Sequence, residues 1–295
     1  MDNVNLNWFT RDEQFPFFIQ YGGHDEDAPL HTHSDFTELV IVLNGNATHI
    51  VNNEEAFIKK GHVFVINSGT SHGYKDPHDF KICNIMYKPE MLNHAGADLK
   101  TSRGFQALFI LEPYFRNLQS FDSKLNISIT SLNDVSSLIA VMIEEYQSQL
   151  QGYKTMLTAR FIELVVYLSR QYENQENDIN SNVMHLATAV SYIEDRYLEP
   201  IALEDIAVQS NISVRHLNRI FKSHYNISPM AYLQRLRLEK ACALLKQSNL
   251  SITEISFQCG YNDSNYLARQ FKKTFGMSPK AFRQYEVPFP NHTSL

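Results

Sequence analysis

The sequence has few of the features that mark secreted or membrane-spanning proteins. It contains three cysteines in 295 residues, Cys83, Cys242 and Cys259, and their spacing matches neither a disulfide framework nor a metal motif. Thiols of this kind fit a reducing compartment. No apolar run approaches the ~20 residues needed to cross a bilayer, and residues 1–8 are polar and lack the pattern of a signal peptide. These absences predict a cytoplasmic protein without a membrane partner.

The net charge of −6 conceals a difference between two parts of the chain. Residues 1–184 carry 13 lysines and arginines against 23 acidic residues, a net charge of −10. Residues 185–285 carry 13 against 8, a net charge of +5. A basic C-terminal part favours contact with a polyanion, whereas the acidic part does not.

The length of the chain suits two domains, because a single core rarely grows to this size. The segment 173–182, ENQENDINSN, has one apolar residue in ten and predicts a linker. Short apolar runs precede residue 90, whereas helical periodicity dominates after the linker. We therefore predict a first domain over 1–172, a linker over 173–184, a second domain over 185–285 and a tail over 286–295.

One sequence pattern occurs twice in the second domain. The stretch ISVRHLNRIFKSHYNISP (212–229) returns as GYNDSNYLARQFKKTFGMSP (260–279), with leucine, arginine, phenylalanine, lysine and Ser-Pro at matching positions. A short amphipathic segment and a turn precede each copy. Gly260 in the second turn and Asn211 in the first are residues that tolerate a positive φ. Each copy predicts a helix-turn-helix, whose second helix enters the major groove of DNA.

The second helix of each copy has a polar outer face opposite a buried apolar stripe. Arginine can read guanine through two hydrogen bonds, asparagine can read adenine, and peripheral lysines suit phosphates. The residues expected to contact DNA are Arg215, Asn218, Arg219 and Lys222 in the first copy, and Ser264, Asn265, Arg269, Lys272 and Lys273 in the second. The alternative, a helical hairpin with a solvated face, is weakened because the same polar chemistry occurs twice.

The segment between the two copies, residues 228–247, predicts one uninterrupted helix. Ser228 suits the N-cap and Pro229 the first helical position. Twenty residues give a rod of ~30 Å, close to the ~34 Å of one DNA turn. Such a rod could place two recognition helices in successive major grooves of one duplex.

These residues resemble a known family. The stretch from Ile201 to Arg283, and above all EISFQCGYNDSNYLARQFKKTFGMSPKAFR, resembles the DNA-binding domain of the AraC/XylS transcription regulators. In that family the base-reading positions correspond to residues 215, 218 and 219 of the first helix and 264, 265 and 269 of the second. The resemblance implies promoter DNA and RNA polymerase as partners, activation of transcription and a homodimer. Leu267 stands where the family usually has phenylalanine, which is a packing change.

The first domain has a different pattern over residues 17–87. Runs of β-forming residues, ELVIVLNG, ATHIVNN, EAFIKKG and HVFVIN, alternate with turn signals at 44–45 and 52–53. Short strands at this spacing predict a β-barrel or jelly roll. Residues 132–150 and 153–172 predict two amphipathic helices that cover the barrel, and the family resemblance implies that such helices form a dimer seam. The predicted fold class is α+β multidomain: an N-terminal cupin-like β-barrel with trailing helices, then an all-α double helix-turn-helix domain.

Four polar residues of the predicted barrel form a motif. His31, His33 and Glu38 have the spacing HxHx4E, and a second segment of the pattern GxxxxxNxGxxH ends at His72. The two segments resemble the motifs of the cupin barrel, although Asn67 stands at a position where proline is usual. The resemblance implies that the four side chains converge, and in metal-binding cupins their counterparts hold one ion. Three imidazoles and a carboxylate would suit Zn²⁺, Fe²⁺ or Ni²⁺.

Several interpretations of this cluster remain open at the level of sequence. It could be the centre of a metalloenzyme, the polar lining of a sensor pocket with or without a metal, or a structural remnant in a closed barrel. Fusion to a DNA-binding domain favours a sensor over an enzyme. We therefore predict a regulator without a cofactor or metal, in which these four residues bind a small-molecule effector. The strand motifs resemble the sensor domains of rhamnose-operon activators in the same family, which implies a carbohydrate such as a deoxysugar.

Overall fold

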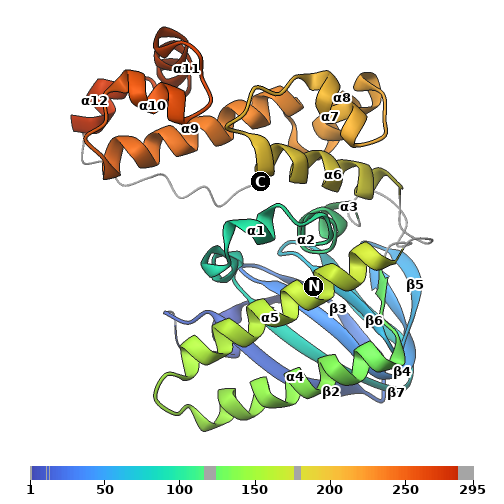
Figure 1. The fold of residues 1–295 in the computed structure, drawn as a ribbon. Coiled ribbons are helices and arrows are strands. Elements are labelled where there is room, and N and C mark those ends of the chain that lie inside the picture. The colour runs from blue at the N-terminus through green and yellow to red at the C-terminus, as the bar shows by residue number, and fades with distance from the viewer. Residues whose placement is uncertain (1, 11, 13, 116–123, 176–180, 285–295) are drawn as a thin grey trace. The chain divides into compact units, whose positions relative to one another are not determined.

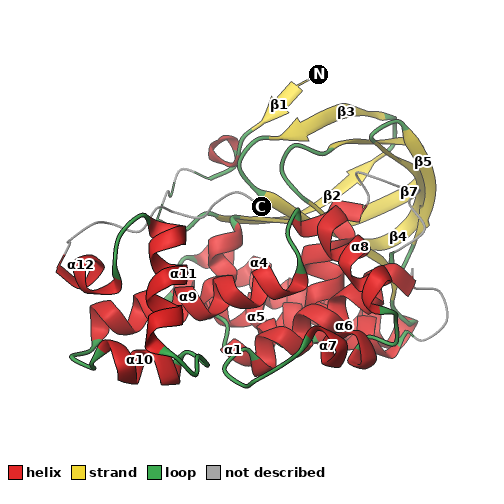
Figure 2. Cartoon of the chain, turned by 90° about the horizontal axis from the view of Figure 1, so that it is seen from above, coloured by secondary structure: helices red, strands yellow, loops and turns green. Residues whose placement is uncertain are grey.

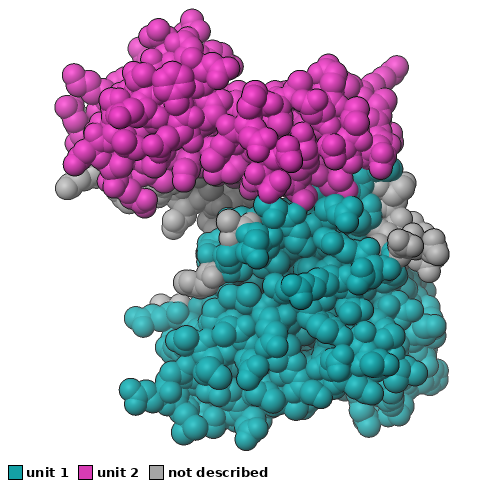
Figure 3. All heavy atoms as spheres, viewed as in Figure 1, with its two compact units in different colours: residues 1–187 teal, residues 188–295 magenta. Residues whose placement is uncertain are grey.

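The structure, a computed structural model, describes the chain except residues 1, 11, 13, 116–123, 176–180 and 285–295. The chain divides into two compact units, Met1–Ala187 and Thr188–Leu295 (Figure 3). Helix α5 ends at Asn174 and helix α6 begins at Ser181. The middle of the predicted linker, residues 176–180, and the predicted tail lie outside the described residues.

The first unit contains one eight-stranded sheet that curls on itself into an open barrel (Figure 1). Strands β4 and β7 are the longest and pair antiparallel with each other at its centre. Strand β7 also pairs with β2 and β3, while β4 pairs with β5 and β6. The strands are β1 (Asp2–Val4), β2 (Phe17–His24), β3 (Ala28–His33), β4 (Thr37–Val51), β5 (Glu54–Lys59), β6 (His62–Ile66), β7 (Ser71–Tyr87) and β8 (Leu125–Asn126). The predicted cupin-like barrel is confirmed.

Two long helices cover one face of this sheet. The ring of Phe161 on α5 (Tyr153–Asn174) lies 5.4 Å from that of Phe17 and 4.8 Å from that of Tyr87. Helix α4 (Ile129–Ser148) contacts α5 and β2. Both helices match the predicted segments to within a few residues. Shorter helical segments are η1 (Leu6–Trp8), η2 (Pro89–His94), α1 (Ala97–Lys100), α2 (Arg103–Phe105), the π-helix η3 (Gln106–Leu111) and α3 (Glu112–Phe115).

The predicted turn at residues 44–45 is wrong. Strand β4 continues through this point, and its register against β7 shifts between Val42 and Thr48. Gly45 has φ +69°, and a Cβ there would lie 2.2 Å from the carbonyl oxygens of His78 and Asp79 on β7. Glycine therefore marks a bulge with close backbone approach rather than a chain reversal. The second predicted turn is confirmed, because residues 52 and 53 have positive φ and join β4 to β5.

The bulge changes which residues of β4 face the barrel interior. Val40 and Val42 belong to the interior cluster before the bulge, whereas Ala47 and Val51 belong to it after the bulge. A shift of one residue moves every later side chain to the opposite face. On β7 the inward-facing residues stay at even-numbered positions throughout, because Tyr74, Phe80 and Ile82 all belong to this cluster.

The second unit is helical, as predicted. Helices α7 and α8 form the first helix-turn-helix, α10 and α11 form the second, and α9 runs between them (Figure 2). The predicted cap at Ser213 is confirmed, since its side chain accepts a hydrogen bond from the backbone of His216, and Ser228 caps α9 in the same way. Helix α6 (Ser181–Arg196) begins in the first unit and ends in the second. The other helices are α7 (Leu203–Gln209), α8 (Val214–Tyr225), α9 (Pro229–Gln247), α10 (Ile252–Gln258), α11 (Ser264–Phe275) and α12 (Pro279–Gln284).

A buried arginine on α9 stabilises the turn of the second helix-turn-helix. Arg237 donates hydrogen bonds to the carbonyl oxygens of Tyr197 and Glu199, both at 2.6 Å, and its guanidinium lies 5.6 Å from the ring of Tyr261. Gly260 has φ +77°, and a Cβ there would lie 2.7 Å from the carbonyl oxygen of Leu198 and 3.1 Å from Arg237 Nε. The turn therefore needs glycine for its conformation and for the space beside Arg237. In the first turn Asn211 has φ 54°, as its predicted role requires.

A comparison of Gly260→Ala with Gly276→Ala should separate the cost of the positive φ from the cost of the clash with Leu198 and Arg237. Both glycines have positive φ, but a Cβ at Gly276 would meet no atom of the described chain within 4 Å. We expect Gly276→Ala to cost about 1 kcal/mol of backbone strain, and Gly260→Ala to cost at least ~2–3 kcal/mol because the clash adds to it. Urea unfolding of both variants measures the difference. Equal losses of stability would contradict the packing described for Leu198 and Arg237.

The second unit should also fold without the first. Its helices enclose their own apolar cluster, which includes Leu238, Leu245, Ile255, Leu267 and Phe271. We expect a fragment of residues 181–285 to be helical by circular dichroism, to unfold cooperatively and to retain DNA binding. An unfolded or non-binding fragment would argue against the predicted division into independent domains.

Candidate functional site

The outer face of α8 is polar and accessible. Leu217 and Phe221 are fully buried, whereas Arg215, Arg219 and Lys222 are exposed. Asn218 is half-buried, and its Nδ2 donates a hydrogen bond to the carbonyl oxygen of Val214 at 3.0 Å. The structure thus places all four predicted residues on one face of the helix, with the two arginines the more accessible to a base edge.

The corresponding face of α11 repeats this arrangement. Asp263 caps the helix by accepting from the backbone of Asn265. Ser264 is half-buried at the first helical position, while Asn265 and Arg269 are exposed. The two lysines at 272 and 273 are exposed in the last turn. All five predicted side chains therefore lie at the surface, although Ser264 is less accessible than the others.

Each principal arginine contacts a ring three residues earlier, a pairing that was not predicted from the sequence. Arg219 Nη2 lies 3.4 Å from Nε2 of His216, and the Arg269 guanidinium lies 5.8 Å from the ring of Tyr266. Residues three apart lie on the same face of a helix, so the spacing carried this signal. Contact with the ring restricts the rotamers of each arginine in the free protein. Less side-chain conformational entropy would therefore be lost when the arginine binds DNA.

Helix α9 separates the two recognition helices, as the sequence predicted. Tyr232, near its start, packs against Phe221 and Tyr225 of α8, with ring distances of 5.7 and 5.1 Å. Its C-terminal half packs against α10 and α11 through Leu238 and Leu245. The helix has 19 residues and is therefore about 28 Å long. Each recognition helix is thus supported by a different end of one rod (Figure 1).

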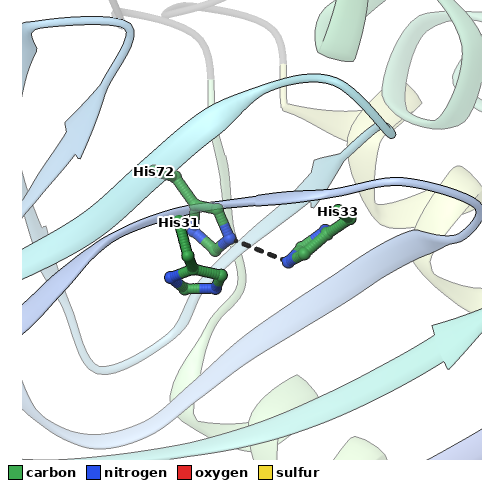
Figure 4. A group of neighbouring side chains, drawn as sticks. All are labelled: His31, His33 and His72. Carbon is green, nitrogen blue, oxygen red and sulfur yellow. Dashed lines mark hydrogen bonds between the residues drawn. The ribbon is translucent and has the colours of Figure 1, made fainter. Parts of the chain in front are cut away.

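In the first unit the three predicted histidines of the barrel converge (Figure 4), and Glu38 lies beside two of them. His31 and His33 lie on β3, Glu38 on β4 and His72 on β7. His33 Nε2 lies 3.0 Å from His72 Nε2, and each of these atoms lies 3.6 Å from Glu38 Oε2. The three inner side chains are almost completely buried, whereas His31 is half-exposed.

Burial changes the protonation of this cluster. It raises the pKa of the Glu38 carboxyl to about 8. Burial, together with the nearby His31, lowers the pKa of His33 to about 3, and burial holds the pKa of His72 well below its usual value. Burial thus favours the neutral form of each of these three groups.

Further polar and aromatic residues surround the cluster, and they were not predicted from the sequence. His49 is fully buried on β4, its ring stacked at 4.9 Å on Tyr74 and 5.7 Å from His72. Asn84 lies on the interior face of β7, and its buried Oδ1 has no hydrogen-bond partner within the described part of the chain. His49 faces the barrel interior because the bulge at Gly45 changes which alternate residues of β4 point inward. A turn was expected at 44–45 from the sequence, and an inward side chain at His49 was therefore not predicted. Asn84 was detectable by its alternation with Phe80 and Ile82.

This interior can accept two kinds of ligand. Neutral imidazoles, a protonated carboxyl and an amide can donate to and accept from sugar hydroxyls. The same imidazoles, with a deprotonated carboxylate, can bind a transition metal ion. Within the described residues no helix is both long and apolar enough to cross a membrane.

Comparisons with known proteins agree with both units. Residues 16–164 match the model of the AraC-like ligand binding domain, and residues 206–285 match a helix-turn-helix domain model. The transcriptional activator RhaR of Mannheimia succiniciproducens is 31% identical over 272 residues, which cover 92% of each chain. The activator RhaS of Escherichia fergusonii is 32% identical over 255 residues, covering 85% of this chain and 86% of its own.

Among solved structures, an AraC-type regulator from Chromobacterium violaceum is 33% identical. It covers 34% of this chain and 89% of its own, with a TM-score of 0.32. The two family matches and the extended similarity to RhaR reach from the barrel to the second recognition helix. The chain therefore belongs to the AraC family, and it is a DNA-binding transcription regulator with a ligand-binding domain rather than an enzyme.

Proposed function

We propose that this regulator activates transcription from promoters in the cytoplasm when its barrel binds a carbohydrate. The observation that carries the proposal is the pairing of a polar, largely buried barrel cluster with two matching basic recognition faces in one chain. Activation is supported by the relatives, both of which are named transcriptional activators. The three cysteines are free thiols, which fits a reducing compartment.

DNA recognition is assigned to α8 and α11. Arg215, Arg219 and Arg269 would read base edges, helped by the asparagines at 218 and 265 and by Ser264. Lys222, with the lysines at 272 and 273, would contact phosphates. A rod of about 28 Å between the two helices is close to one DNA turn of ~34 Å, which supports contact with successive major grooves.

The effector is assigned to the barrel interior beside His31, His33, Glu38 and His72. A carbohydrate is favoured because polar groups, together with stacked rings such as His49 on Tyr74, match hydroxyls and C–H faces of a sugar. The resemblance of the strand motifs to the sensor domains of rhamnose-operon activators points to a deoxysugar within this class.

A homodimer that contacts RNA polymerase completes the proposal. Helices α4 and α5 carry exposed apolar side chains, among them Ile129 at 74%, Val141 at 45% and Met156 at 46% exposure. The family resemblance assigns the helices that follow the barrel to the dimer seam, and these side chains would be available to such a contact. The contact with polymerase rests on the family resemblance and on the activators among the relatives.

The recognition faces can be tested by three substitutions. Arg219→Ala and Arg269→Ala should each weaken specific binding by ~1–3 kcal/mol and relax base preference at separate positions of the operator. Lys222→Ala should weaken binding to all sequences alike and reduce the salt dependence. Footprinting and titrations at several salt concentrations measure both effects. Unchanged footprints for both arginine variants would remove α8 and α11 from base recognition.

The effector assignment can be tested by Glu38→Gln, which keeps the shape of the side chain but removes its acid group. We expect weaker binding of the sugar, measured by calorimetry, together with unchanged DNA binding through the second unit. His78→Gln, on an exposed part of β7, is the control and should bind the sugar normally. Normal sugar binding by both Glu38→Gln and His72→Gln would place the effector elsewhere.

A further inference from the structure

The same pair of side chains occurs at matching positions of the two recognition helices. The third residue of each helix carries a ring, His216 in α8 and Tyr266 in α11, and the arginine three residues later lies against it. Arg219 Nη2 is 3.4 Å from His216 Nε2, and the Arg269 guanidinium is 5.8 Å from the centre of the Tyr266 ring. The two copies thus hold Arg219 and Arg269, the recognition arginines, in the same way.

Other arginines of the second unit are held by carboxylates. Arg196 lies 3.3 Å from Glu199. Arg235 lies 2.8 Å from Glu239. Within the described chain neither recognition arginine has an acidic partner. A carboxylate would neutralise the guanidinium and occupy the N–H donors that a bidentate contact with guanine requires. An aromatic face or an imidazole nitrogen leaves the positive charge and most of the donors available to DNA.

The ring of Tyr266 is itself held from the interior of the second unit. It lies 5.9 Å from the ring of Tyr261, which is 3% exposed. The hydroxyl of Tyr261 donates to Gln234 Oε1 of α9 at 3.0 Å, and the guanidinium of Arg237 lies 5.6 Å from the same ring. A continuous row of contacts therefore runs from α9 through two tyrosine rings to Arg269.

In α8 the ring is held through the first turn of the helix. The backbone amide of His216 donates to Oγ of the N-cap residue Ser213 at 3.2 Å, and the His216 side chain is half-buried. Arg219 is exposed and can only donate hydrogen bonds, so its contact uses the lone pair of His216 Nε2. A half-buried side chain in a capped turn has less freedom than the arginine that it contacts, and it limits the rotamers of that arginine.

We propose that His216 and Tyr266 are positioning residues for base recognition: each holds one recognition arginine in the orientation that reads a guanine, without touching the base itself. This role rests on the proposed assignment of Arg219 and Arg269 to base edges. A bidentate contact with guanine requires one orientation of the guanidinium, whereas contact with a phosphate tolerates many. The two rings therefore contribute to sequence specificity more than to overall affinity.

The test uses the full-length chain and a library of DNA duplexes with a random central segment, from which the bound sequences are read. His216→Ala and Tyr266→Ala should each reduce the base preference at one operator position by roughly 2- to 5-fold, as expected for the loss of an exposed contact of this kind. Arg219→Ala and Arg269→Ala should reduce the same preferences by roughly 5- to 150-fold. Affinity for non-specific DNA and its salt dependence should not change in the ring variants, because no phosphate contact is lost.

Three further variants separate positioning from other roles. Tyr266→Phe keeps the ring and removes the hydroxyl, and His216→Tyr supplies the ring that the second copy carries at this position. Both should retain the base preference of the unmodified protein. Tyr192→Ala is the matched control, because it removes a ring 5.7 Å from Arg196 on α6, outside the recognition helices. It should leave every base preference unchanged.

Two results would overturn the positioning role alone. One is full base preference in His216→Ala and Tyr266→Ala while the arginine variants lose it, because the arginines would then need no support. The other is equal loss in Tyr266→Phe and Tyr266→Ala, which would show that the hydroxyl contacts DNA directly. Unchanged preferences in the arginine variants would overturn the assignment of base reading as well. If Tyr266→Ala lowers the melting temperature, Tyr266→Leu, which keeps apolar packing without an aromatic face, decides in its place.

Discussion

The bend of the β4–β7 ladder at Gly45 is the constraint on which the sensor site depends. Glu38 pairs with Met86 at one end of the ladder, while His72 pairs with Val51 at the other. Thirteen residues of straight strand would span about 43 Å, yet the side chains of Glu38 and His72 meet at 3.6 Å. Only a sheet curled into a barrel can bring them together. The bulge, where the backbones approach too closely for any Cβ, is one place where that curvature is introduced.

The same bulge determines the chemistry of the interior. By shifting the parity of β4, it turns His49 inward beside Tyr74 and His72. Polar groups thereby lie together in the buried interior, where desolvation favours the neutral forms of the imidazoles and of the carboxyl. Neutral imidazoles are the forms that bind a metal ion or accept from a hydroxyl. The fold thus prepares the site for a ligand through desolvation as well as through position.

In the barrel the functional side chains are buried, whereas in the DNA-binding unit they must be exposed to solvent. Leucine and phenylalanine on the inner stripe of each recognition helix fix its orientation, and the arginines on the outer face remain accessible. The two helix-turn-helix units reach this result with different turns. Asn211 adopts a positive φ in the first, whereas the second requires Gly260, because Leu198 and Arg237 lie too close for a side chain.

Much of this architecture followed from the sequence, because its determinants are local. Caps at Ser213 and Ser228, apolar stripes of helical period and the repeated polar positions depend on neighbours within a few residues. The helices of both helix-turn-helix units and the helix between them could therefore be predicted, whereas α6 and α12 were not. The barrel could be predicted from the pattern of short strands, and the convergence of its four polar residues from the resemblance of their motifs to those of the cupin barrel. The continuity of β4, the inward position of His49 and the rings beside Arg219 and Arg269 could not. They depend on strand pairing and on side-chain contacts that only the folded chain creates. The 3.0 Å between His33 and His72 and the 3.6 Å between Glu38 and His72 were likewise decided by the closure of the barrel, which brings together residues that are 39 and 34 positions apart in the sequence.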